Sequence, residues 1–208
     1  NKLGPLTTNQ YEGLYVLTEK IGAGGKRIPG PKLQPEDNTL PDITGPYVMK
    51  IDRLDPGDTG VTMGGMSVAM INPKEKDLKL AQRAAQKKYL TDYVNGMSRG
   101  FLAANRRNPT NSYENYIEMG RAIDYHILEM LSGNVDTMVL SAYFHKPRNQ
   151  KLIFGPHWDF DRALGSTDGR DSNPRSWTCG PVFAGWYGQL FQDTEAWQRW
   201  VDRFQQLR

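Results

Sequence analysis

The segment VLSAYFHKPRNQKLIFGPHWDFDR, residues 139–162, predicts a β-hairpin that runs directly into an acidic loop. Its two arms, 139–146 and 151–154, are rich in β-branched and aromatic residues, and turn-forming residues separate them. Two aspartates follow the second arm within a few residues. We therefore expect the hairpin to deliver this acidic loop to a candidate site.

The rest of the chain changes from strand to helix periodicity. Strands are expected where β-forming residues dominate, at 13–20, 47–53 and 66–71. Apolar residues that recur every three or four positions predict amphipathic helices at 77–104, 113–131 and 194–208. Because the strands lead and the helices follow, the order predicts an α+β fold and not alternating βαβ units.

The composition sets limits on function. The 208 residues carry 26 Lys+Arg and 23 Asp+Glu, a net charge of +3 that is spread along the chain, so nucleic-acid binding is not predicted. No apolar run approaches the roughly 20 residues that span a bilayer. The single cysteine, Cys179, excludes an internal disulfide. The chain opens at Asn1 with no signal peptide, and we expect it to be part of a longer protein.

The strongest candidates for chemistry are Asp159 and Asp161. They stand two apart after a predicted strand, so both could project from one face. Carboxylates held that close repel each other unless a cation or a shared proton relieves them, and Mg²⁺, Mn²⁺ or Ca²⁺ prefers such oxygen ligands. The alternatives are a solvated turn or a helix cap and, less favoured, a transition-metal site with His157 and nearby His145.

Asn134 and Asp136 follow the second expected helix, at its junction with the hairpin. Both could simply be caps, which the residues alone favour. The functional alternative places a carboxylate opposite Asp159 and Asp161 as a base or a second metal ligand.

Glu19 and Lys50 are charged residues inside expected strands. Paired across adjacent strands, they could hold a phosphate-binding lysine in place. An ordinary cross-strand ion pair on a wet face explains them equally simply, and the residues alone favour it.

Five segments occur in one order along the chain: GLYVLTEKI (13–21), YVMKIDRLDPGD (47–58), NPKEKDL (72–78), AIDYHILEMLSGNVDTMVLSAYFHK (122–146) and KLIFGPHWDFDRALGS (151–166). The most specific element is N-x-D followed by G-P-x-W-D-F-D-x-A-x-G. Together, these segments resemble the CotH family of spore-coat-type atypical protein kinases.

The resemblance implies a reduced kinase-like fold, with 1–75 as the remnant of a strand-rich N-terminal lobe and 76–208 as a mostly helical C-terminal lobe. It implies ATP with Mg²⁺ or Mn²⁺ as cofactors and a protein with a Ser or Thr acceptor as substrate. It also implies a bacterial protein of the cell envelope or another extracytoplasmic location. Because no H-R-D tripeptide is present, a standard protein kinase is excluded.

The resemblance also implies roles for single residues. Asp159 corresponds to the metal-binding aspartate, and Asp136 corresponds to the base or substrate-orienting residue. Supporting ligands and contacts with the nucleotide phosphates are expected from Asn134, Asp161, Lys50 and Glu19.

Two alternatives keep the fold without this activity. One is a non-catalytic surface or adhesion module, and the other is a metal-dependent phosphohydrolase. One departure from the family pattern is His157, which stands where an aliphatic residue is expected.

Overall fold

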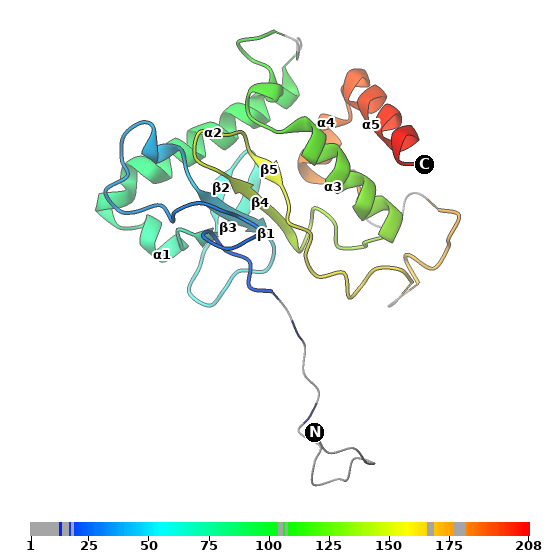
Figure 1. Cartoon of the computed structure of the whole chain (residues 1–208), viewed down its shortest axis with the longest axis horizontal. Coiled ribbons are helices and arrows are strands. Elements are labelled where there is room, and N and C mark those ends of the chain that lie inside the picture. The colour runs from blue at the N-terminus through cyan, green and yellow to red at the C-terminus, as the bar shows by residue number, and fades with distance from the viewer. Residues whose placement is uncertain are drawn as a thin grey trace.

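A five-stranded antiparallel sheet lies at the centre of the fold (Figure 1). The computed structural model describes residues 13, 17, 19–103, 106, 108–165, 169–176 and 182–208. The strands are β1 (Tyr47–Ile51), β2 (Val61–Met63), β3 (Met66–Asn72), β4 (Ala142–Lys146) and β5 (Ile153–Phe154). Their spatial order, β2-β3-β1-β4-β5, places the expected hairpin beside β1, so strands from both ends of the chain share one sheet.

The helices cover one face of this sheet and one of its ends. Figure 1 shows α2 running behind the sheet, while α3, α4 and α5 group beside β5. Short 3-10 turns occur at Asp42–Thr44, Ala81–Arg83 and Tyr113–Asn115. The α-helices are α1 (Glu75–Leu78), α2 (Ala84–Leu102), α3 (Met119–Ser132), α4 (Gly185–Leu190) and α5 (Thr194–Leu207).

Strand alternation sorts the residues of β1 between two environments. Tyr47, Met49 and Ile51 join the main hydrophobic core. Val48 points the other way and packs in a small cluster with Ala23 and Ile28. Lys50 shares that opposite face, so its side chain emerges on the side of the sheet away from the main core.

The α+β class predicted from the sequence is confirmed, with differences at element ends. The long helix begins at Ala84 rather than at 77, because Leu80 is extended (φ −70°, ψ 138°) and separates it from α1. The next helix begins at Met119 rather than at 113, because Ile117 bridges Leu152 in the hairpin. The short elements β2 and α4 were not predicted.

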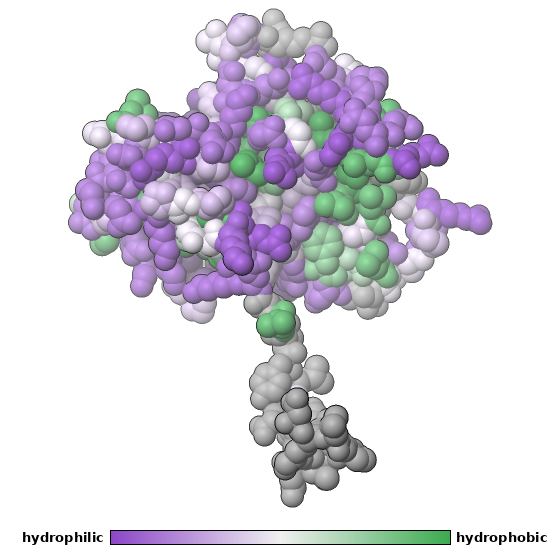
Figure 2. All heavy atoms as spheres, viewed as in Figure 1, coloured by the Kyte–Doolittle hydropathy of each residue, from purple (hydrophilic) through white to green (hydrophobic). Residues whose placement is uncertain are grey.

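Half of the expected strand at 13–20 lies outside the described residues, and its described positions, 13, 17, 19 and 20, are not in a strand. Cys179 also lies outside the described residues. The division of the chain into lobes at residue 76 stays a prediction. Figure 2 shows a largely hydrophilic face on which apolar side chains gather over α3, where Leu128 and Leu131 are 49% and 55% exposed. Within the described residues, no helix combines the length and the apolar character needed to cross a membrane.

Candidate active site

Lys50 is held by acidic side chains that follow its own strand. Its Nζ lies 3.3 Å from Oδ2 of Asp52 and 3.8 Å from Oδ1 of Asp55. The Lys50 side chain is 13% exposed, and its cross-strand neighbour is Tyr143 of β4. The described contacts therefore pair Lys50 with the residues after β1, not with Glu19.

Asp159 lies in the loop after β5. The predicted alternation with Asp161 does not apply, since β5 ends at Phe154 and Asp159 has a left-handed backbone (φ 60°). The two carboxylates are nevertheless neighbours. Partial burial and then the adjacent Asp161 raise the pKa of Asp159, and the hydroxyl of Ser141 lies 3.5 Å from its Oδ2. A cation at this position would relieve the repulsion.

Asp52 connects the lysine to the acidic loop. Its negative charge is a further cause of the raised pKa of Asp159. The same charges act on Tyr143. Its pKa is raised to about 12, mainly by burial and further by Asp52, Asp55 and Asp159. Lys50, Asp52 and Asp159 thus belong to one charged cluster at the end of β1, although they come from opposite ends of the chain.

Asp136 lies in the turn that ends α3. The helix stops at Gly133, which adopts a left-handed backbone (φ 63°) that glycine tolerates. The amide oxygen of Asn134 then accepts the backbone N–H of Asp136 at 3.1 Å. Asp136 is 9% exposed, and its Oδ1 lies 3.8 Å from Nη1 of Arg162. Because Arg162 follows Asp159 by three residues, the acidic loop returns beside this turn.

Asn134 has both ends of its amide engaged. Its Nδ2 donates to Oε2 of Glu129 at 2.7 Å, while its oxygen accepts from Asp136, and the residue is 2% exposed. This geometry orients Asp136. A direct role of Asn134 in metal or nucleotide binding stays a prediction.

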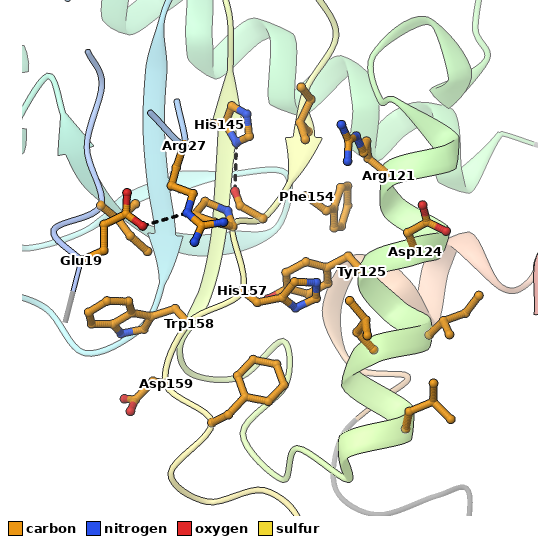
Figure 3. Close-up of a pocket in the computed structure, with 18 of the residues that line it drawn as sticks. Glu19, Arg27, Arg121, Asp124, Tyr125, His145, Phe154, His157, Trp158 and Asp159 are labelled. Carbon is orange, nitrogen blue, oxygen red and sulfur yellow. Dashed lines mark hydrogen bonds and ion pairs between the residues drawn. The ribbon is translucent and has the colours of Figure 1, made fainter. Parts of the chain in front are cut away.

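Glu19 lines a cavity of about 900 Å³ that Asp159 also lines. Arg27 donates to Glu19 at 2.8 Å, and both residues line the cavity together with Trp158 and Asp159 (Figure 3). Among the described residues, Glu19 does not pair with Lys50. Glu19 pairs with Arg27 instead. Arg27 was not among the site residues predicted from the sequence.

The donor set fits Mg²⁺ or Mn²⁺, which prefer oxygen ligands, better than an ion that prefers histidine ligands, such as Zn²⁺. Magnesium is commonly held by one or two carboxylates plus phosphate oxygens, which Asp159 and Asp161 can begin to provide. Among the described residues, no group of three or more His, Cys, Asp or Glu is arranged to hold an ion by itself. His145 and His157 each use Nδ1 in an internal hydrogen bond, to Gly155 and Glu129 respectively, which leaves Nε2 as the remaining ring nitrogen of each.

Glu129 is the part of the site that sequence reasoning missed. It is 1% exposed and contacts both the Asn134 turn and His157 of the acidic loop. The available signal was an acid inside the apolar run HILEML of an expected helix.

The mixed α+β fold is consistent with a reduced kinase-like fold, and it carries a sheet lysine, a pair of loop carboxylates and a carboxylate in the turn after a helix. The family model described as CotH kinase protein matches residues 5–208, and the chain belongs to this family. No curated protein and no solved structure gives a significant match.

Proposed function

We propose that the protein transfers the γ-phosphate of ATP to a Ser or Thr hydroxyl of a protein acceptor, with Mg²⁺ or Mn²⁺ as the required ion. The observation that carries this proposal is the charged cluster of Lys50, Asp52 and Asp159. Lys50 is a cation that can contact phosphates, and its partner Asp52 acts electrostatically on Asp159. A divalent cation would relieve the repulsion between Asp159 and Asp161.

Asp159 and Asp161 would hold the ion, which neutralises phosphate charge when bound. Lys50 would contact the phosphates after giving up part of its interaction with Asp52. Glu19 and Arg27 line the same cavity as Asp159, which supports this cavity as the nucleotide site. The Arg27 guanidinium is 68% exposed at its side chain, so it is accessible to a phosphate oxygen.

Asp136 would orient the acceptor and take its proton. The hydroxyl oxygen forms a bond to the γ-phosphorus, the bond from that phosphorus to the bridging oxygen of ADP breaks, and the proton goes to the Asp136 carboxylate. Asn134 supports this step because its amide oxygen accepts the N–H of Asp136 and fixes the turn. Membership of the CotH kinase family supports a protein acceptor and, within the same proposal, a bacterial and extracytoplasmic setting.

A thermal-shift titration tests the nucleotide site. ATP with Mn²⁺ should stabilise the wild-type protein by about 2.7 kcal/mol at a hundredfold excess over Kd, and the shift should vanish without Mn²⁺ or in Asp159→Ala. A protein that shows no shift in any condition would contradict the kinase proposal and favour a surface-binding module. Release of phosphate from a simple phosphate ester without an acceptor would favour a phosphohydrolase.

A further inference from the structure

The carboxylate of Glu129 joins three segments around the proposed site. Tyr125, one turn earlier in α3, makes a side-chain hydrogen bond to it. Asn134 and Thr137 bind it from the turn that carries Asp136, and His157 binds it from the acidic loop. Such a buried carboxylate requires several donors to offset its lost hydration, and the fold supplies them.

The hydrogen-bond directions follow from the donors. The amide nitrogen of Asn134 can only donate, so Glu129 accepts with its Oε2 at 2.7 Å. Oε1 lies 3.1 Å from Nδ1 of His157. Because an ionised carboxylate only accepts, Nδ1 of His157 carries the hydrogen and donates it to Glu129.

His157 is held from a second side by an aromatic stack. Its ring lies parallel to the ring of Tyr125, with centroids 4.4 Å apart and an angle of 8° (Figure 3). Tyr125 is 3% exposed and thus has a fixed position in the core. The stack sets the plane of the imidazole, and the hydrogen bond to Glu129 sets its rotation.

The loop that carries Asp159 has further attachments to α3 and to the turn after it, among them Nη1 of Arg162, which lies 3.8 Å from Oδ1 of Asp136. After β5 ends at Phe154, the backbone N–H of Leu164 donates to the carbonyl of Ser132 at 2.7 Å. Asp159 therefore lies between attachments on both sides of it: His157 on Glu129 comes before it, and Arg162 on Asp136 and Leu164 on Ser132 come after it.

We propose that His157 and Glu129 are positioning residues that fix the loop of Asp159 against the turn of Asp136. The connection runs from His157 to Glu129, from Glu129 to Asn134, and from Asn134 to the N–H of Asp136. This inference rests on the proposed function, because it assigns the two aspartates to one reaction. Misplacement of reacting groups by about 1 Å can lower a rate about 10²-fold, which is the reason to fix them relative to each other.

Two substitutions separate the hydrogen bond from the stack. His157→Phe keeps a ring over Tyr125 but removes the donor to Glu129. His157→Asn removes the ring but keeps an N–H donor near the position of Nδ1. If the hydrogen bond is the positioning contact, His157→Asn restores what His157→Phe loses.

Hydrogen exchange of the peptide amides of residues 157–164 tests this without any enzymatic activity. In His157→Phe these amides should exchange about tenfold faster than in the wild type, as expected for losing a hydrogen bond to a charged group, while the melting temperature changes little. His157→Asn should exchange near the wild-type rate. Unchanged exchange in His157→Phe, or equal acceleration in both variants, would overturn the inference.

The second measurement is the KM for ATP with Mn²⁺ and the kcat of transfer. His157→Phe should lower kcat about 10²-fold, as misplacement predicts, and His157→Asn should recover most of it. Wild-type protein without transfer activity would contradict the proposed function, whereas the exchange data would still decide the positioning role. Normal kcat in His157→Phe would overturn the inference even if the kinase proposal holds.

Discussion

The Nζ of Lys50 lies 3.3 Å from Oδ2 of Asp52, two residues further along the chain. The carboxylate that pairs with the lysine is also one of the charges that raise the pKa of Asp159. The lysine and the acidic loop are therefore electrostatically connected through Asp52. Removing the Lys50 charge should disturb the metal loop as well as the phosphate contacts.

For Lys50→Met we expect loss of the ATP-dependent thermal shift and a decrease in transfer rate of roughly 10²-fold or more, because one phosphate-stabilising cation is removed. Lys88→Met is the matched control, since Lys88 pairs with Asp92 on the exposed side of α2. Equal nucleotide binding by wild type and Lys50→Met would contradict the role of Lys50.

Asn134→Ala should reduce both stability and activity. The substitution leaves a hydrogen-bonding position of Glu129 and the N–H of Asp136 without their partner, which should lower the free energy of unfolding by about 1–3 kcal/mol. Urea unfolding measures the stability, and transfer kinetics measured well below the transition show whether kcat falls too. A variant with wild-type stability and kcat would argue that the amide does not position Asp136.

His126 predicts a dependence of stability on pH. Burial lowers its pKa to about 4, and its neutral ring accepts from Nε1–H of Trp200 in α5 at 3.1 Å and donates to the Val182 carbonyl at 2.8 Å. The unfolded chain takes up a proton near pH 6.5 and the folded protein does not. The free energy of unfolding should therefore fall as the pH decreases from 6.5 to 4, by roughly 3 kcal/mol at most.

Denaturant unfolding at pH 7, 6, 5 and 4 measures this effect, and His126→Phe provides the comparison. The variant should lose the part of the pH dependence that belongs to His126, whatever its absolute stability. His145, whose pKa is also lowered by burial, contributes in the same direction in both proteins. Identical pH profiles for wild type and variant would show that His126 is not responsible.

Glu75 should hold the loop before β2. It accepts from the backbone N–H groups of Thr59 and Gly60, and Nζ of Lys79 lies 2.7 Å from its Oε1. Burial alone would raise its pKa, but the hydrogen bonds from Lys79, Thr59 and Gly60 lower it to about 2. Its contribution to stability should therefore be present above pH 4.5 and decline toward pH 2.

Glu75→Gln should lower the free energy of unfolding by about 1–3 kcal/mol at pH 7, measured in urea, with the difference from wild type shrinking toward pH 2. Glu36→Gln, a change at another acid in the N-terminal half, serves as the control. A difference that stayed constant over this pH range would contradict the role of the ionised Glu75 carboxylate.

The sequence predicted those elements whose signal is local. Strand periodicity located β1, β3 and the hairpin, and spaced apolar residues located α3 and α5. The long helix was placed too early, because Ala81 and Ala85 match the four-residue spacing but are exposed in the structure. The strand β2 is only three residues long, too short for periodicity to identify.

Prediction of the site was limited because several of its contacts form only when the chain folds and cannot be read from local sequence. The proximity of Asp159 and Asp161 followed from their spacing, although the backbone reaches it through a left-handed residue rather than a strand. Lys50 pairs with Asp52, which follows β1, and Glu19 pairs with Arg27. The predicted pairing of Lys50 with Glu19 was therefore wrong. Glu129 was missed because only packing shows that an acid in a helix is buried.

The most direct test of the central claim is transfer of labelled γ-phosphate from ATP to protein in the presence of Mn²⁺. Wild type, Asp136→Asn and Asp159→Asn should be compared on casein as a generic acceptor and on the protein itself. We predict labelled Ser or Thr with the wild type and a rate at least about 10²-fold lower with each variant. No labelling by the wild type, or equal labelling by all three proteins, would contradict the account.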